Sequence, residues 1–118
     1  MTTSDFKLAQ IALACWRAAQ GELHQVMLAV AQTFMNRGGD LYEETTKWLS
    51  DNPGAFPDPR DPQFQQLLAR LDSVTIGLAK DVTDGAWAFV RKTDLQPDML
   101  QAFSITTQIG GLVFVKGK

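Results

Sequence analysis

Hydrophobic residues recur every three or four positions in the first third of the chain, with one glycine between two such stretches. This spacing is typical of amphipathic helices, and it predicts two helices, over about residues 5–19 and 22–36, that meet at Gly21. Two helices joined by a tight turn pack as an antiparallel or steeply crossed pair, here with Trp16 and Phe34 as the bulkiest contacts. We expect this pair to be the scaffold of the fold. Its apolar stripes are formed by Leu8, Ile11, Ala12, Cys15 and Ala19, and by Leu23, Met27, Val30, Ala31 and Phe34.

The middle of the chain alternates between helical and helix-breaking segments. Gly38-Gly39 ends the second helix, and residues 43–49 are compatible with a short helix. The proline-rich segment 51–62 predicts a loop that is long enough to form one wall of a cleft. A further helix is predicted from Asp61, which caps it, to about Lys80. Its buried stripe is formed by Phe64, Leu67, Leu68, Leu71, Val74 and Leu78.

The last third of the chain has short β-branched or aromatic segments separated by turn residues, which predicts a small antiparallel sheet. Gly110-Gly111 is expected to form a tight turn, and residues 92–102 a flexible loop. The expected fold class is therefore α+β and mainly helical, with two or three core helices and a C-terminal sheet in one domain over residues 1–118. The predicted strands are residues 86–90, 104–107 and 112–115.

Composition and charge exclude several classes of protein. With 45% hydrophobic and 20% charged residues, the chain has the balance of a globular domain. Its net charge of −2 indicates no basic surface of the kind that binds nucleic acid. The first residues lack the charged start and the apolar run of a secretory signal, and no segment approaches the roughly 20 apolar residues of a membrane span. We therefore expect a monomer that is made in the cytoplasm, without a nucleic-acid partner and without membrane insertion.

The sequence lacks the residues that several common chemistries require. The single cysteine, Cys15, lies on the apolar face of the first helix and is expected to be plain core, and the single histidine, His24, is expected to be solvated. There is no Gly-rich phosphate loop and no Gly-x-Ser-x-Gly motif. We therefore expect no metal, no cofactor, no phosphoryl transfer and no serine hydrolysis.

The junction of the first two helices is a candidate site for acid catalysis. Side chains from both helices meet there, and a partly desolvated carboxyl group has the raised pKa that a general acid needs near neutral pH. The acidic residue at the junction is Glu22. A carboxylate here also stabilises a helix N-terminus by about 0.3–1 kcal/mol, and the local sequence leaves both roles open.

Around this junction the sequence reads Ala18-Ala19-Gln20-Gly21-Glu22, and Ala29-Val30-Ala31 and Asn36-Arg37 follow it. These residues resemble the SleB-like cell-wall hydrolases, whose signature reads Glu-Ala-Arg-Gly-Glu, a short spacer, Ala-Val-Ala and Asn-Arg. Ala18 takes the place of the first glutamate, which the family uses as its catalytic acid, and Gln20 takes the place of the arginine. Glu22 matches the second glutamate, which borders the catalytic cleft in the family. The matching residues are Ala19, Gly21, Glu22, Ala29, Val30, Ala31, Asn36 and Arg37.

Two later blocks resemble the same family in the same order. Residues 81–89 resemble Asp-Pro-Thr-Asn/Gly-Gly-Ala followed by aromatics, with Val82 in place of the proline. Residues 109–114 resemble Ile-Gly-x-His-x-Phe, with Leu112 in place of the histidine, and residues 48–50 take the place of a central Gln-Phe-Ser. The resemblance implies that position 18, Glu22 and the turn at residues 81–87 lie around one cleft.

The family resemblance implies a lysozyme-like fold that cleaves the glycan strand of peptidoglycan, as a muramidase or a lytic transglycosylase, once a holin, a phage tail or lysis delivers it to the cell wall. Because Ala18 replaces the general acid, this form is expected to be catalytically inactive, with the alanine either engineered or native. A native alanine fits a non-catalytic glycan-binding or interaction module, such as a phage particle component. The residues expected to contact glycan are Gln20, Trp48, Asp81, Thr83 and Trp87.

These glycan contacts have simpler alternatives. Trp48 and Trp87 are candidates for stacking on sugar faces, and both are also compatible with packing in the core or in a cleft wall. Asp81 and Thr83 lie next to Gly85 in a segment that is typical of a turn, where such side chains bind neighbouring backbone amides.

Overall fold

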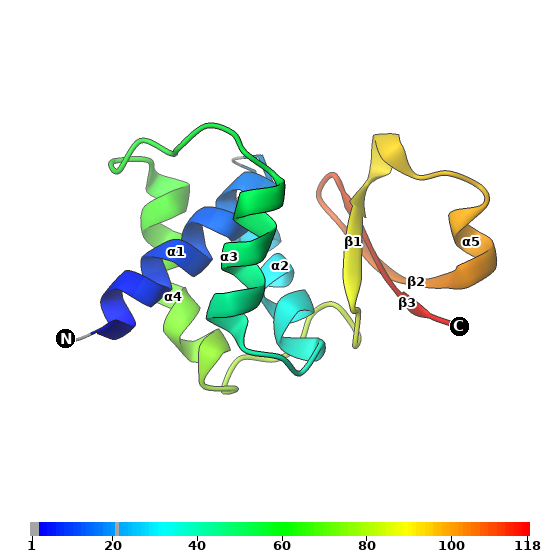
Figure 1. Cartoon of the computed structure of the whole chain (residues 1–118), viewed down its shortest axis with the longest axis horizontal. Coiled ribbons are helices and arrows are strands. Elements are labelled where there is room, and N and C mark those ends of the chain that lie inside the picture. Colours follow the sequence, from blue (N-terminus) through cyan, green and yellow to red (C-terminus); the bar gives the residue numbers. More distant parts are fainter. Residues whose placement is uncertain (1–2, 21) are drawn as a thin grey trace.

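The computed structural model describes residues 3–20 and 22–118, and it has a helical part and a sheet part that lie side by side (Figure 1). About half of the described chain is helical, which confirms the predicted α+β class with a small C-terminal antiparallel sheet. The four longer helices are α1 (Thr3–Ala18), α2 (His24–Asn36), α3 (Leu41–Asp51) and α4 (Pro62–Thr75).

Helix α2 is the centre of the helical part, because α1, α3, α4 and the sheet all pack against it. Most of its side chains are buried, and Phe34 is fully buried as expected, whereas Trp16 on α1 is only partly buried. The predicted junction residue, Gly21, lies outside the described residues. On either side of it, α1 ends at Ala18 and α2 begins at His24.

Helix α3 is longer at both ends than the predicted segment 43–49. The carboxylate of Asp40 accepts the backbone N–H of Glu43 at 2.9 Å, so the helix begins directly after this cap. The buried hydroxyl of Thr45 donates to the carbonyl of Leu41 at 2.8 Å and ties the first turn together. The proline-rich segment that follows α3 is a loop, as predicted.

Helix α4 begins at the predicted cap, where the Asp61 carboxylate accepts the backbone N–H of Gln63 at 2.8 Å. Its predicted end was wrong, because the helix stops at Thr75 rather than near Lys80. Gly77 has φ +79°, and the N–H of Leu78 turns back to the carbonyl of Ser73 at 2.9 Å, which is the Schellman pattern of a helix end. Leu78 therefore lies beyond the helix and is 79% exposed instead of buried.

The sheet consists of three antiparallel strands in the order β1-β3-β2. As predicted, Gly110-Gly111 forms the tight turn between the last two strands, and the φ of +59° at Gly110 favours glycine there. The strands are β1 (Ala88–Arg91), β2 (Phe103–Ile109) and β3 (Leu112–Gly117).

The segment between β1 and β2 is more ordered than the predicted flexible loop. It contains a short 3-10 helix, η1 (Lys92–Asp94), and a short α-helix, α5 (Met99–Ala102). Figure 1 shows this segment as an arch at the outer side of the sheet, away from the four longer helices.

Aromatic side chains join the sheet to the helices. Phe89 on β1 lies with its ring centroid 6.0 Å from Phe34 of α2, 6.3 Å from Trp48 of α3 and 6.5 Å from Phe114 of β3. Phe34 and Phe114 are fully buried. The cluster therefore sets β1 against α2 and α3, and the space beside it forms a pocket.

Candidate functional site

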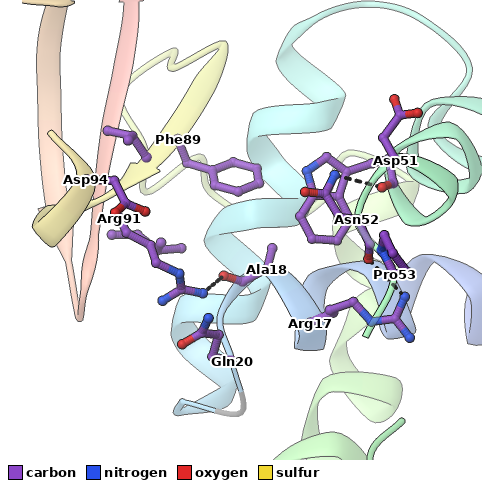
Figure 2. Close-up of a pocket in the computed structure, with 12 residues that line it drawn as sticks. Arg17, Ala18, Gln20, Asp51, Asn52, Pro53, Phe89, Arg91 and Asp94 are labelled. Atoms are coloured by element: carbon purple, nitrogen blue, oxygen red, sulfur yellow. Dashed lines mark hydrogen bonds between the residues drawn. The ribbon is translucent and has the colours of Figure 1, made fainter. Parts of the chain in front are cut away.

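A pocket of about 560 Å³ lies between the C-terminal ends of α1 and α3 and strand β1 (Figure 2). Three of the residues expected at the site, Ala18, Gln20 and Trp48, line it together. Its walls are formed by Arg17, Ala18 and Gln20 after or within α1, by Trp48, Asp51, Asn52 and Pro53 around the end of α3, and by Phe89, Val90, Arg91, Asp94 and Leu112 from the sheet side.

Ala18 is the last residue of α1, and its side chain is 4% exposed. The last carbonyls of a helix have no partner within the helix, and that of Ala18 accepts a guanidinium N–H of Arg91 at 2.8 Å. This bond ties the end of α1 to the last residue of β1, as Figure 2 shows. The methyl group of Ala18 therefore lies at a fixed place on the pocket wall.

Arg17 fixes the loop wall of the pocket. Its guanidinium donates to the carbonyls of Asn52, Gly54 and Ala55 at 3.0–3.2 Å and lies 5.4 Å from the ring centroid of Phe56. With these contacts, the loop after α3 is held against the end of α1. No signal in the sequence predicts this role, because a lone arginine on a helix matches no motif and its partners are backbone atoms in a distant loop.

Trp48 and Phe89 give the pocket an aromatic surface. Both are partly buried, and their rings are tilted by 49° to each other. Phe89 was expected in a strand but not at the site, because its position depends on how the sheet packs against α3. Around these rings the pocket carries hydrogen-bonding side chains from Gln20, Asn52 and Arg91.

The carboxyl groups that line the pocket belong to Asp51 and Asp94, and both residues are exposed. Neither has the buried environment that turns a carboxyl group into a general acid near neutral pH. Position 18, which is nearly buried, carries a methyl group instead. The pocket can therefore bind a polar ligand with apolar faces, but the described residues that line it include no buried carboxyl group.

Glu22 contacts the sheet and does not line this pocket. Both of its carboxylate oxygens accept the backbone N–H of Gly111, at 3.1 and 3.2 Å. The residue therefore binds the β2–β3 turn from the helical side. The sequence left two roles open for Glu22, a general acid and a charge at a helix N-terminus. Neither role includes this contact with a distant turn.

Asp81 and Thr83 lie at the other end of α2, beside Asn36. The side-chain amide of Asn36 donates to the Asp81 carboxylate at 2.9 Å, to the Thr83 hydroxyl at 3.2 Å and to the carbonyl of Ala86 at 3.0 Å. Asp81 also accepts the N–H and hydroxyl of Thr83, at 2.8 and 2.6 Å, and the N–H of Gly85 at 3.0 Å. Thr83 is fully buried. The side chains of Asp81 and Thr83 therefore hold this turn together, which is the simpler alternative to glycan contact that the sequence offered.

The pKa of Asp81 reflects these contacts. Burial alone raises the pKa of the carboxyl group, but the hydrogen bonds from Thr83, Asn36 and Gly85 outweigh burial and lower the pKa below its ordinary value. Asp81 is therefore held in its charged form as part of the fold.

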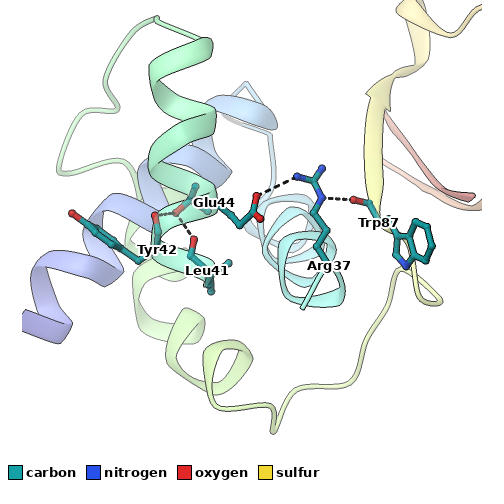
Figure 3. A network of polar contacts seen from close by, with 6 residues as sticks. Arg37, Leu41, Tyr42, Glu44 and Trp87 are labelled. Carbon is teal, nitrogen blue, oxygen red and sulfur yellow. Dashed lines mark hydrogen bonds and ion pairs between the residues drawn. The ribbon is translucent and has the colours of Figure 1, made fainter. Parts of the chain in front are cut away.

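Trp87 is 54% exposed and lies just before β1, near the Asp81 turn. Its carbonyl accepts the Nε–H of Arg37 at 2.6 Å, and Arg37 also lies 3.9 Å from the Glu44 carboxylate (Figure 3). Asp81, Thr83 and Trp87 do not line the pocket that holds Ala18. The turn at residues 81–87 was expected to share one cleft with position 18, and this expectation is not met. The turn lies beside the C-terminal end of α2, whereas the pocket lies beside the end of α1 and the far end of β1.

Comparison of the chain with protein-family models, with curated proteins and with solved structures finds no match in any of the three. Among the described residues, no group of three or more His, Cys, Asp or Glu side chains is placed to hold a metal ion. No helix in the same residues is long and apolar enough to cross a membrane.

The cysteine and the histidine both lie outside the pocket. Cys15 is fully buried in the core, as expected, and burial raises the pKa of its thiol to about 12. His24 was expected to be solvated, but its Nδ1 lies 2.9 Å from the side-chain oxygen of Gln63 and its Nε2 lies 3.0 Å from the guanidinium of Arg70. That expectation was wrong, because the first turn of α2 packs against α4.

Proposed function

We propose that the pocket at the end of α1 binds the glycan strand of peptidoglycan, on a SleB-like, lysozyme-like scaffold that lacks its general acid. The observation that carries the proposal is the place of Ala18. The residue that the resemblance aligns with the catalytic glutamate lies at the end of a helix, nearly buried, on the wall of a pocket of about 560 Å³.

The lining of the pocket supports a sugar ligand. Trp48 and Phe89 offer aromatic faces against which the C–H faces of a sugar ring can pack. Gln20, Asn52 and Arg91 can form hydrogen bonds with hydroxyl and N-acetyl groups, which fix the orientation of a ligand in a mostly preformed pocket. Because Arg17 and Arg91 are held by backbone carbonyls, the walls are fixed before a ligand binds.

The parent reaction is cleavage of the glycosidic bond. A carboxylic acid at position 18 would protonate the glycosidic oxygen as the bond to the sugar carbon breaks, and the oxocarbenium-like sugar would be captured by water or by its own 6-hydroxyl group. General acid catalysis contributes roughly 10²–10⁴-fold to the rate. With alanine at position 18, the chain binds glycan and cleaves it very slowly.

A non-catalytic binding or interaction module is the second candidate function, and the same alanine favours it. If the native gene encodes alanine at position 18, the chain is a glycan-binding module on a hydrolase fold, for example a component of a phage particle. If the native gene encodes glutamate there, the chain is an engineered form of an active glycosidase. Sequencing the native gene at codon 18 separates the two.

Glycan binding is tested by following backbone and indole NMR signals during titration with muropeptides or chitooligosaccharides. Signals from Gln20, Trp48 and Arg91 should shift together, while the indole signal of Trp87 should stay in place. Trp48→Ala should weaken binding about fivefold, since an aromatic contact contributes about 1 kcal/mol, and Trp87→Ala is the matched control. Shifts centred on Trp87, or no shifts at all, would overturn the proposal.

A further inference from the structure

Glu22, which lies just before α2, contacts a distant part of the sheet. Its carboxylate lies against the β2–β3 turn, and both oxygens accept the N–H of Gly111 at 3.1 and 3.2 Å. A hydrogen bond with a charged acceptor is stronger than a neutral one. The contact joins the entrance of α2 to a turn that lies almost ninety positions later in the chain.

The two glycines of the turn are shaped to receive this carboxylate. A Cβ atom on Gly110 would lie 2.6 Å from one oxygen of Glu22, and a Cβ atom on Gly111 would lie 2.9 Å from the other. Gly110 also has a positive φ, which favours glycine by itself, but Gly111 does not. At position 111, therefore, a methyl group would have to displace the Glu22 carboxylate from its place against the turn.

The turn leads directly into the sheet wall of the pocket. Leu112 follows Gly111, lines the pocket, and pairs across the sheet with Arg91. Arg91 in turn donates to the carbonyl of Ala18, and the N–H of Lys92 donates to the carbonyl of Gly111 at 2.9 Å. Glu22 and Arg91 therefore hold the pocket end of the sheet against the end of α1 and the start of α2.

The other end of the sheet is attached independently. There Asn36 donates to the carbonyl of Ala86 at 3.0 Å, and Arg37 donates to the carbonyl of Trp87 at 2.6 Å. The aromatic cluster around Phe89 lies between the two ends. Loss of the Glu22 contact would therefore leave the sheet attached while loosening the end that forms the pocket wall.

We infer that Glu22 is a positioning residue, which holds the Gly110-Gly111 turn and thereby sets the width of the glycan pocket between α1 and β1. It does so by accepting the Gly111 N–H, and it neither donates a proton nor touches the sugar. This inference rests on the proposed glycan-binding function of the pocket.

The test compares Glu22→Ala, Glu22→Gln and Arg37→Ala, with calorimetric titration of a disaccharide muropeptide and hydrogen exchange at the Gly111 amide. Glu22→Ala should weaken muropeptide binding about tenfold and speed Gly111 exchange, since one charged hydrogen bond is lost. Glu22→Gln keeps an acceptor oxygen, so its affinity should stay within about threefold of the parent. Arg37→Ala removes an attachment at the far end of the sheet, so it should lower stability without changing affinity.

A second pair of variants keeps the test independent of overall folding. Gly111→Ala should weaken binding in the parent, because its methyl group displaces the Glu22 carboxylate. The same substitution should add no further loss in a Glu22→Ala background. Independent, additive losses from the two substitutions would contradict a shared contact.

The possible results separate this inference from the function it rests on. Unchanged affinity of Glu22→Ala in a parent that binds muropeptide overturns the positioning role and leaves the proposed function intact. If Glu22→Gln binds muropeptide as weakly as Glu22→Ala, the charge of Glu22 contacts the ligand directly. This result would also overturn the positioning role. If the parent binds no muropeptide, the proposed function fails. If hydrogen exchange at the Gly111 amide is also unchanged in Glu22→Ala, Glu22 does not stabilise the turn, and the positioning role fails as well.

Discussion

Replacing Asp81 by alanine should lower the free energy of unfolding by about 2–4 kcal/mol. Its carboxylate accepts four hydrogen bonds, from the N–H and hydroxyl of Thr83, the side chain of Asn36 and the N–H of Gly85. A single hydrogen bond with a charged group contributes about 1.5–3 kcal/mol, but Asp81 is partly exposed and water can replace some of these partners. The sum of the four contributions is therefore an upper limit, and the expected loss is the smaller value of about 2–4 kcal/mol.

Urea denaturation at neutral pH measures this loss directly. Asp72→Ala is a suitable control, because Asp72 is an exposed acid on α4 and its removal should change stability by less than about 0.5 kcal/mol. A loss below about 1 kcal/mol for Asp81→Ala would refute the structural role assigned to this carboxylate.

The same contacts predict a dependence of stability on pH. Because the pKa of Asp81 is lower in the folded chain than its ordinary value of 3.8, the group stabilises the fold fully at pH values above that ordinary value. This contribution is lost as the pH falls through the lower, folded-state pKa. The parent should therefore lose stability below about pH 4, and Asp81→Asn should flatten that part of the profile. Superimposable acid profiles of the two proteins would contradict the account.

Three further predictions concern the core, the thiol and a helix end. Leu71→Ala should cost about 2–5 kcal/mol of unfolding free energy in urea, whereas Leu78→Ala, at an exposed position beyond α4, should cost almost nothing, and equal losses would mean that α4 is misassigned. Cys15, buried and with its pKa raised to about 12, should react with a thiol reagent only after unfolding, and rapid reaction of the native protein would contradict its burial. Gly77→Ala should destabilise the protein by about 1 kcal/mol, because its φ of +79° strains any residue with a Cβ, and a stabilising effect would contradict the Schellman end of α4.

The sequence predicted most of the fold, because its signals are local. Apolar spacing gave the first two helices, the Asp61 cap gave the start of α4, and Gly110-Gly111 gave the turn of the sheet. The errors also have local causes. Gly77 ends α4 although the apolar spacing continues to Leu78, and Asp40 starts α3 earlier than the spacing alone indicates.

The site was predicted less completely, because it depends on how the sheet packs against the helices. Ala18 and Gln20 are close in sequence, and Trp48 joins them in one pocket. Arg91 and Phe89, which complete the pocket, come from a strand whose register and packing follow from contacts distant in the chain. The same packing places Glu22 against the β2–β3 turn, a contact that no spacing in the sequence indicates.

The measurement that tests the central claim most directly is the release of soluble glycan fragments from purified peptidoglycan by Ala18→Glu. Position 18 lies on the wall of the pocket of about 560 Å³. If the pocket binds glycan as proposed, a carboxylic acid added there would be placed to protonate the glycosidic oxygen. Ala18→Gln has nearly the same size without the acid and is the matched control. We predict that Ala18→Glu releases fragments at least about 100-fold faster than the parent and that Ala18→Gln does not. Mass spectrometry of 1,6-anhydro or reducing ends would then distinguish a transglycosylase from a hydrolase. If Ala18→Glu folds with the stability of the parent and still releases no fragments, the pocket is not that of a glycosidase lacking only its acid.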